Sequence, residues 1–180
     1  MRFNPTQNIN LRLSYSSGFR APQAFDEDMH IENVGGTVAM IERAKDLKEE
    51  KSQSFSVSAD MYHRFGAFQT NLLIEGFYTR LTDVFVLGKP YDRGDGILVK
   101  TRSNGPGAKV MGLTLEGKVA YLSILQIQAG LTLQRSRYDE PHKWHDDAPA
   151  EKKIFRTPDT YGYFTATCTP IKPLSIALSG

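Results

Sequence analysis

Two short polar segments carry side chains of the kinds that bind metal ions. His142 and His145 are three residues apart and precede Asp146 and Asp147. A metal site at this spacing would need a helical turn and further ligands, so a solvated loop is the simpler interpretation. The oxygen-rich run 92–96 offers fewer ligands than the roughly six to eight that calcium takes, and its glycines are ordinary turn residues. We therefore predict no metal site and no cofactor.

An acidic cluster in the N-terminal part of the chain could supply paired carboxylates for acid–base chemistry. Its members are Asp26, Glu27, Asp28, His30 and Glu32. No nucleophile or oxyanion device accompanies them, and the chain shows no Gly-x-Ser-x-Gly turn and no phosphate-binding glycine loop. The sequence therefore favours a polar loop or the rim of a binding site over an enzyme.

The segments that must position these loops have a strict two-residue period. In 125–134 every odd position is apolar or small and every even position is polar or small, and the alternation recurs in 9–15, 54–61 and 111–119. Successive side chains of a strand point to opposite faces, so each segment has one apolar and one polar face. Strands of about ten alternating residues are typical of an outer-membrane β-barrel, although a soluble sandwich also alternates.

The connections between the predicted strands alternate between long polar segments and tight turns. An up-and-down barrel needs this pattern, with long loops outside and short turns on the periplasmic side, whereas a Greek-key sandwich has no reason to sort its loops by parity. The sequence therefore predicts an all-β fold of antiparallel up-and-down strands that forms part of a transmembrane β-barrel. The long connections are 17–51, 81–107 and 138–157, and the turns are 63–66, 122–124 and 170–173. The strands, about seven, are 7–16, 52–62, 67–80, 108–121, 125–137, 158–169 and 174–178.

Aromatic residues fall near both ends of the apolar faces. Tyr15 and Tyr78 lie at the loop ends of their predicted strands, and Phe68 and Tyr121 lie at the turn ends. Aromatic girdles at the two membrane interfaces would place them there, although aromatic residues are also good strand formers. In 161–168 neither face is clearly apolar, so the period does not assign the sides of this strand.

Composition and chain boundaries set further limits. Hydrophobic residues make up 40% of the chain and the mean hydropathy is −0.38, and no run approaches the ~18 apolar residues of a spanning helix. A net charge of +2 gives no reason to expect a nucleic-acid partner, and the single Cys168 cannot form an internal disulfide. The first residues are not a secretory signal, and an odd number of strands is unusual for a bacterial barrel. We therefore expect 1–180 to be a partial barrel, a segment of a larger one.

Four passages, in order and across nearly the whole chain, resemble TonB-dependent outer-membrane receptors. They are 15–22, with its Gly-Phe-Arg-Ala-Pro run and the acidic stretch 25–28 after it; 46–52, similar to an Asp-Leu-x-x-Glu-x-Ser strand entry; 75–85, an aromatic strand that leads into Asp83-x-Phe85; and 104–116, similar to an Asn-x-x-x-Ala-x-x-x-Gly strand. The members that these passages resemble include transporters of cobalamin and of ferric siderophores.

The resemblance implies a 22-stranded transporter in the outer membrane of a Gram-negative cell, with an N-terminal plug inside the barrel. In that family the plug carries a short box bound by the energy-transducing protein TonB. Residues 1–180 contain neither the plug nor the box. TonB would act on the receptor only through those missing parts. This chain is then about seven interior strands of the C-terminal half, with outer-membrane lipid around it, in a receptor for active uptake of a scarce ligand of the cobalamin or ferric-siderophore class.

The same resemblance places ligand contacts in the outer loops, where a small molecule or metal chelate would bind. The expected ligand-binding residues are Arg20, Gln23, Asp26, Asp28, His30 and Tyr91. The alternative is a self-contained all-β binding or structural domain without a transport role.

The two-residue period also predicts faces and pairing. Strand 52–62 should pair with 67–80, 108–121 with 125–137, and 158–169 with 174–180, all antiparallel. The lipid-facing set is Ile9, Leu11, Leu13, Phe55, Val57, Leu113, Leu115, Ile127, Leu131 and Leu133. The lumen-facing set is Asn10, Arg12, Ser56, Asp60, Glu116, Lys118, Gln126 and Gln128. A one- or two-turn helix at 39–44 is compatible with these expectations.

Overall fold

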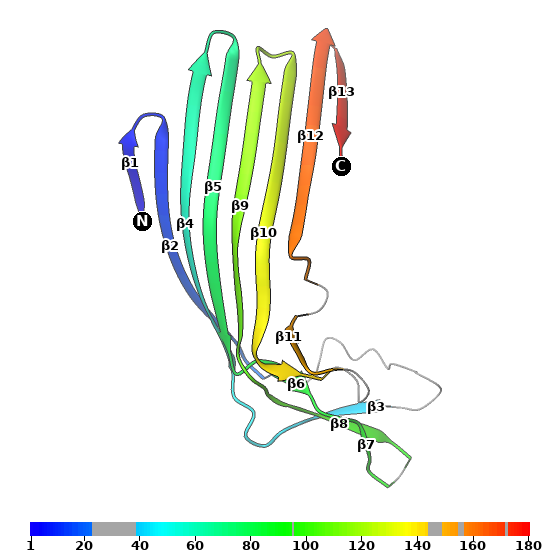
Figure 1. The fold of residues 1–180 in the computed structure, drawn as a ribbon. Coiled ribbons are helices and arrows are strands. Elements are labelled where there is room, and N and C mark those ends of the chain that lie inside the picture. Colours follow the sequence, from blue (N-terminus) through cyan, green and yellow to red (C-terminus); the bar gives the residue numbers. More distant parts are fainter. Residues whose placement is uncertain (23–38, 95, 144–148, 155–156, 172) are drawn as a thin grey trace.

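The computed structural model describes residues 1–22, 39–94, 96–143, 149–154, 157–171 and 173–180. These residues form two β-sheets, which we call the main sheet and the outer sheet (Figure 1). The main sheet has the order β1-β2-β4-β5-β9-β10-β12-β13, and the short β11 pairs with β10. Its strands are β1 (Arg2–Thr6), β2 (Ile9–Arg20), β4 (Glu50–Phe65), β5 (Phe68–Thr82), β9 (Ala108–Tyr121), β10 (Leu125–His142), β11 (Glu151–Lys153), β12 (Thr160–Ile171) and β13 (Leu174–Ser179). No helix in the described part of the chain is long and apolar enough to cross a membrane.

Each predicted hairpin is present and antiparallel. β4 pairs with β5, β9 with β10, and β12 with β13. The β4–β5 turn consists of residues 66–67, shorter than expected, and Gly66 adopts a φ of 59° that a two-residue hairpin loop requires. All the tight turns lie at one end of the main sheet and all the long connections at the other (Figure 1). The predicted up-and-down architecture is therefore confirmed.

The structure differs from the expected elements in two places. Residues 2–6, left outside the predicted strands, form β1, which pairs with β2 as an edge strand and so tolerates Pro5. Residues 39–43 form a strand, β3, where a helical turn was compatible with the sequence. Further short strands occur inside the long connections, because backbone N–H and C=O groups there form hydrogen bonds with another segment of a long connection.

The register places the predicted apolar residues together on one face of the main sheet, which we call the apolar face. Leu13 pairs with Val57, Leu113 with Leu133, and Leu115 with Leu131. These side chains are exposed, with Val57 59% and Leu113 47% accessible. The apolar set predicted from the two-residue period is therefore confirmed as a single surface.

The predicted polar residues share the opposite face, which we call the polar face. Asn10 pairs with Asp60, and Gln128 with Lys118. Neighbouring strands exchange hydroxyl hydrogen bonds across this face, Ser54 Oγ with Thr79 Oγ1 at 2.9 Å and Thr114 Oγ1 with Thr132 Oγ1 at 3.1 Å. Asp60, Thr132 and Ser136 are buried, whereas most of the apolar face is open.

Two aromatic belts border the apolar face. Tyr15 and Phe55 have ring centroids 4.7 Å apart near the long connections, and Tyr78 is the next residue in the same cross-strand row. At the turns, the Phe68 ring contacts Tyr121 at 4.9 Å. Rows 55 and 65 of β4 are ten residues apart, which is about 33 Å along a strand and about 25 Å for a strand tilted by about 40°. This is the height of the apolar band of a transmembrane barrel.

The strand whose sides the sequence left open is assigned by its neighbours. Ala166 pairs with Ile127 and Cys168 with Leu125, so they lie on the apolar face together with Phe164. Tyr163 pairs with Gly130, and its side chain lies on the polar face. The ambiguity arose because tyrosine and threonine occupy the polar side and small residues interrupt the apolar side.

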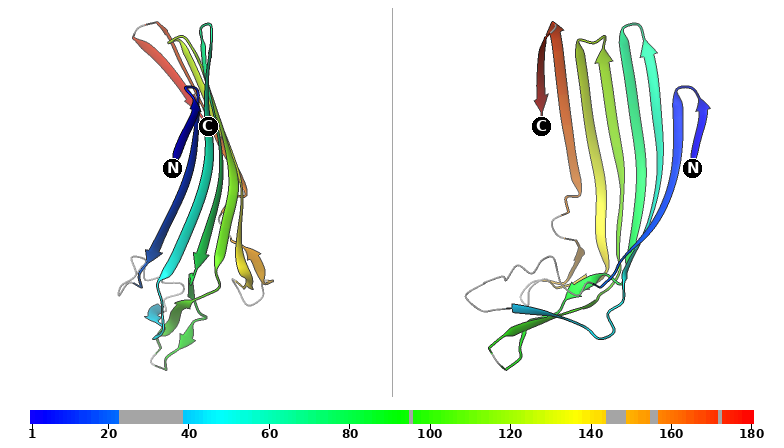
Figure 2. Two further views of the ribbon diagram at one scale, coloured as in Figure 1. Left: turned by 90° about the vertical axis from the view of Figure 1, so that its left-hand side faces the viewer. Right: turned by 180° about the vertical axis from the view of Figure 1, so that it is seen from behind.

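The main sheet is a single layer. Figure 2 shows the long strands bending and twisting without a second sheet or helix stacked on them. Among the described residues, Val99 and Ala108 are the buried hydrophobic side chains, so there is no ordinary core between layers. A soluble domain buries its apolar face against another element. The described residues supply none, so the apolar face is left uncovered.

Candidate ligand-binding surface

The outer sheet joins two of the long connections. It contains β3 (Ala39–Arg43) from the first and β6 (Phe85–Leu87), β7 (Tyr91–Asp92) and β8 (Leu98–Asn104) from the second. β3 runs parallel to β8, while β6 and β7 pair antiparallel with β8. Val99, the second residue of β8, is fully buried. The described strands of the two connections therefore form one folded unit beyond the end of the main sheet (Figure 1).

The side chain of Asn104 connects the outer sheet to the rim of the main sheet through hydrogen bonds. Its Oδ1 accepts a hydrogen bond from Lys48 N at 2.7 Å. Its Nδ2 donates to Lys48 O at 2.9 Å and to Asp83 O at 2.8 Å. The Asn104 side chain thus provides hydrogen-bond partners for backbone N–H and C=O groups of both connections, which bent backbone would otherwise leave unpaired. Asp83 itself adopts a positive φ of 56°, which turns the chain from β5 toward the outer sheet.

Arg20 lies at the same junction. It ends β2 opposite Glu50 of β4, and its guanidinium lies 5.3 Å from the centroid of the Phe85 ring. The Phe85 backbone N donates to Glu50 Oε2 at 3.0 Å, which holds the ring in place. The cation–π contact orients Arg20 while leaving the residue exposed.

Tyr91 lies on β7 of the outer sheet, away from the junction that holds Arg20. It pairs with Val99, and its hydroxyl is 3.5 Å from Glu42 Oε2, a long and weak contact. Phe85, beside Arg20, pairs with Asn104, five residues from Val99 on β8. That spacing is about 17 Å along the strand, so Arg20 and Tyr91 do not converge on one point. The other expected ligand-binding residues, Gln23, Asp26, Asp28 and His30, lie outside the described residues.

Sequence reasoning missed the structural roles of three residues at this rim. Glu50, Phe85 and Asn104 come from separate passages of the sequence, and the structure brings them together. The signal was present, because each belongs to one of the passages that carried the family resemblance. A pattern of single residues does not show which backbone groups their side chains bind, so the junction could not be derived.

The two segments with candidate metal ligands are only partly among the described residues. No group of three or more His, Cys, Asp or Glu side chains there could hold a metal ion. In the run 92–96, Gly94 N donates to Asp92 Oδ1 at 2.7 Å and Gly94 has a φ of 97°. This is a turn stabilised by an aspartate side chain. His145 lies outside the described residues.

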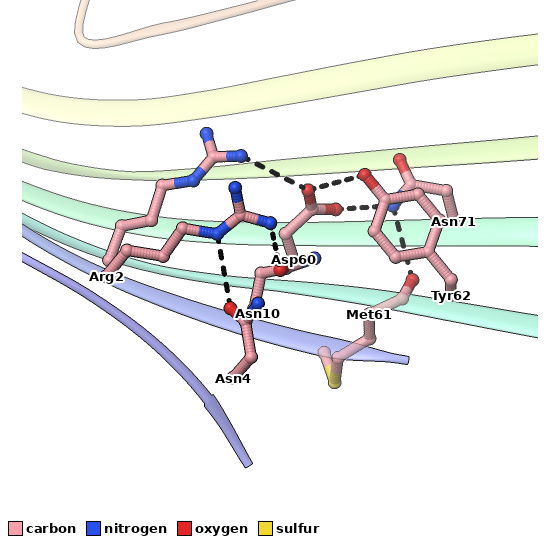
Figure 3. A network of polar contacts seen from close by, with 8 residues as sticks. Arg2, Asn4, Asn10, Asp60, Met61, Tyr62 and Asn71 are labelled. Atoms are coloured by element: carbon pink, nitrogen blue, oxygen red, sulfur yellow. Dashed lines mark hydrogen bonds and ion pairs between the residues drawn. The ribbon is translucent and has the colours of Figure 1, made fainter. Parts of the chain in front are cut away.

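A second polar assembly lies on the polar face near the turns (Figure 3). Asp60 Oδ2 accepts from the Tyr62 hydroxyl at 2.7 Å, and Asp60 Oδ1 accepts from Asn71 Nδ2 at 2.5 Å. Arg12 Nη2 lies 4.0 Å from Asp60 Oδ2. On the adjacent strand Arg2 Nη2 donates to Asn10 Oδ1 at 2.6 Å. This network, centred on Asp60, links side chains of β2, β4 and β5.

A shallow hollow of about 420 Å³ occupies the middle of the polar face. Glu75, Glu116 and Tyr163 are among its lining residues, and Gln128 Nε2 donates to the Tyr163 hydroxyl at 2.9 Å. Gly130 lies beneath the Tyr163 ring, where a side chain would clash. The hollow presents carboxylates and phenols to whatever occupies the interior of a closed barrel.

Comparison with solved structures finds the same fold in transporters. The FrpB iron transporter from Neisseria meningitidis (F3-3 variant) matches 98% of this chain with a TM-score of 0.63 and 17% identity. The apoprotein form of its F5-1 variant matches 99% with a TM-score of 0.55 and 14% identity. The copper transporter OprC matches 99% with a TM-score of 0.51 and 11% identity. This chain spans 24%, 30% and 29% of those chains, respectively.

The sequence comparisons give the family. A search of curated proteins found no match. A family model described as TonB dependent receptor-like, beta-barrel, matches residues 1–167. That match covers nearly the whole chain, and the single-layer sheet with one apolar and one polar face is what the family requires. The chain belongs to the TonB-dependent receptor β-barrel family, whose members are receptors of the outer membrane.

Proposed function

We propose that this chain forms part of the wall and outer entrance of an outer-membrane receptor for active uptake of a scarce ligand, of the cobalamin or ferric-siderophore class. The observation that carries the proposal is the outer sheet. The described strands of two long connections, β3 from one and β6, β7 and β8 from the other, form one sheet at the end opposite the tight turns. A preformed surface at the outer entrance can capture a ligand without first ordering its loops.

The two faces of the main sheet fit the partners of such a receptor. The apolar face meets outer-membrane lipid, and the polar face lines the interior. TonB acts through a plug and its box, which we assign to the intact protein outside residues 1–180. The solved structures with this fold include an iron and a copper transporter, which favours a metal chelate within the proposed ligand class. Binding and transport, rather than catalysis, is the role that follows.

The proposed ligand contacts are Arg20, Gln23, Asp26, Asp28, His30 and Tyr91. Arg20 is an exposed cation held by Phe85, which suits it to an anionic chelate. Tyr91 presents an aromatic ring at the outer sheet, about 17 Å away along β8. The two residues would therefore contact different parts of a ligand or act in successive steps of its entry.

Replacing Arg20 by alanine in the intact protein should weaken ligand binding at least about fivefold, equivalent to about 1 kcal/mol. The physical reason is the loss of a positioned cation at the entrance. Uptake of radiolabelled ferric siderophores and of labelled cobalamin by cells that express the receptor measures the effect. Lys51→Gln is a matched control, because Lys51 pairs with Phe19 at the same rim but on the apolar face.

The proposal fails if the inserted receptor takes up and binds neither ligand class. The assignment of Arg20 fails separately if Arg20→Ala and Lys51→Gln behave alike. Heat-modifiable migration on gels shows whether each variant has a folded barrel, so a folding defect is distinguished from a binding defect.

A further inference from the structure

Four cations form a cross-strand row on the apolar side of the main sheet, just beyond the aromatic belt near the long connections. Arg80 pairs with Lys109, Lys109 with Arg137, and Arg137 with Lys153. We call these four residues the basic row. Arg135 lies on the same side, one step inward, where it pairs with Met111. Like charges directly opposite one another on adjacent strands destabilise a sheet, so this arrangement needs counter-charge.

The described part of the chain supplies that counter-charge only in part. Asp139 binds Arg80 through two contacts of 2.6 and 2.7 Å. Asp159 lies 2.9 Å from Lys153 Nζ and 3.8 Å from Arg137 Nη1. The hydrogen bond from Lys153 holds the pKa of Asp159 below its ordinary value, so this carboxylate is ionised at neutral pH.

Two cations of this surface have no such close partner. Lys109 is half-buried and Arg135 is exposed, and neither side chain makes a hydrogen bond or a short ion pair with another described residue, although Asp159 attracts Arg135 from farther away. Lys109 lies one row beyond the aromatic row of Phe55 and Tyr78, and Arg135 lies within that row. Long cationic side chains at this level lay their alkyl stems on apolar surface and hold their charges at the membrane–water boundary. Their natural counter-ion is therefore a lipid head group.

We propose that the basic row, with Arg135, binds the phosphate groups of a phosphorylated glycolipid in the outer leaflet of the outer membrane. The inference rests on the proposed placement of the long connections outside the cell. Adjacent strands are about 4.8 Å apart, so the row extends over about 14 Å and can contact more than one phosphate. Guanidinium groups bind phosphate oxygens in pairs, and basic clusters beside membrane segments are recognised head-group sites. A bound lipid of this kind would relieve the repulsion within the row.

The test uses the intact receptor in detergent micelles and measures binding of bisphosphorylated lipid A by native mass spectrometry. We expect the wild type to bind this lipid and to bind its dephosphorylated form much more weakly. The double variant Lys109→Gln/Arg135→Gln should bind bisphosphorylated lipid A roughly 30-fold less tightly, at about 1 kcal/mol per Lys or Arg. The control variant Lys118→Gln should bind bisphosphorylated lipid A as tightly as the wild type does. Lys118 lies on the polar face of β9, the strand that also carries Lys109.

Three results would overturn the inference. They are equal binding of the phosphorylated and dephosphorylated lipids by the wild type, wild-type affinity in the double variant, and full competition by inorganic phosphate at the same phosphate concentration. The first needs no variant, so a folding defect cannot obscure it. Ligand uptake should be retained in the double variant. In the wild type, equal binding of the two lipids together with normal uptake would contradict this inference alone, whereas phosphate-dependent lipid binding without uptake would contradict the proposed function alone.

Discussion

Replacing Leu115 by arginine is expected to destabilise the inserted barrel by about 2–4 kcal/mol. Leu115 lies near the middle of the apolar band, between Ile74 and Leu131, and is 44% exposed. An arginine there would place a charge in the hydrocarbon region, far from either head-group layer. Urea unfolding of the intact protein in lipid bilayers, followed by tryptophan fluorescence, measures the change in the free energy of unfolding.

The adjacent residue provides the control. Glu116 lies on the polar face, where it lines the hollow described above, and Glu75 is a diagonal neighbour. Glu116→Arg should therefore cost far less than Leu115→Arg. Equal costs for the two substitutions, or a larger cost at position 116, would mean that the apolar face does not meet lipid.

Replacing Asp60 by alanine is the second substitution with a large expected effect, about 1–3 kcal/mol. Asp60 is buried at 8% exposure and accepts hydrogen bonds from Tyr62 and Asn71, both of which would lose this acceptor, although Asn71 keeps its bond to the Met61 carbonyl oxygen. Arg12 is half-exposed and 4.0 Å away, so solvent screening makes its ion pair a minor contribution. The same unfolding measurement in bilayers gives the loss.

Glu116→Ala is the matched control for Asp60→Ala. Both carboxylates lie on the polar face, but the Glu116 side chain makes no hydrogen bond or ion pair with a described residue. Its removal should change the free energy of unfolding by no more than about 0.5 kcal/mol. If the two alanine variants are equally stable, the network of Figure 3 does not join the strands as its geometry indicates.

The long strands could be predicted because one simple rule governs them. Leu113 and Leu133 had to lie on one face, since a shift of register by one residue would move every apolar side chain to the polar side. Loop length then decided which strands pair, because a short turn such as 66–67 leaves no other neighbour. The assignment failed only at 161–168, where side-chain polarity does not differ between faces.

The outer sheet could not be predicted because its contacts are remote in sequence. Ile41 of β3 pairs with Lys100 of β8, and Asn104 binds Lys48 across the same junction. Neither segment has a two-residue period of its own, so local pattern could not distinguish strand from helical turn at 39–43. The expected ligand contacts shared this limitation, since Arg20 and Tyr91 were grouped by loop, and the structure places Arg20 at the end of β2 in the main sheet and Tyr91 in β7 of the outer sheet.

The placement of the two faces can be tested directly by site-directed spin labelling of β9. A nitroxide is attached singly at positions 113–119 of the intact protein in bilayers, with Cys168 replaced by serine. Position 112 is avoided, because a Cβ there would lie 2.6 Å from the Leu133 carbonyl oxygen. Collisions with lipid-soluble oxygen should be greatest at 113, 115, 117 and 119, and lowest at 114, 116 and 118. Collision rates without this two-residue alternation, or with water-soluble nickel chelate reaching the odd positions most, would contradict the assignment of this chain as a membrane barrel wall.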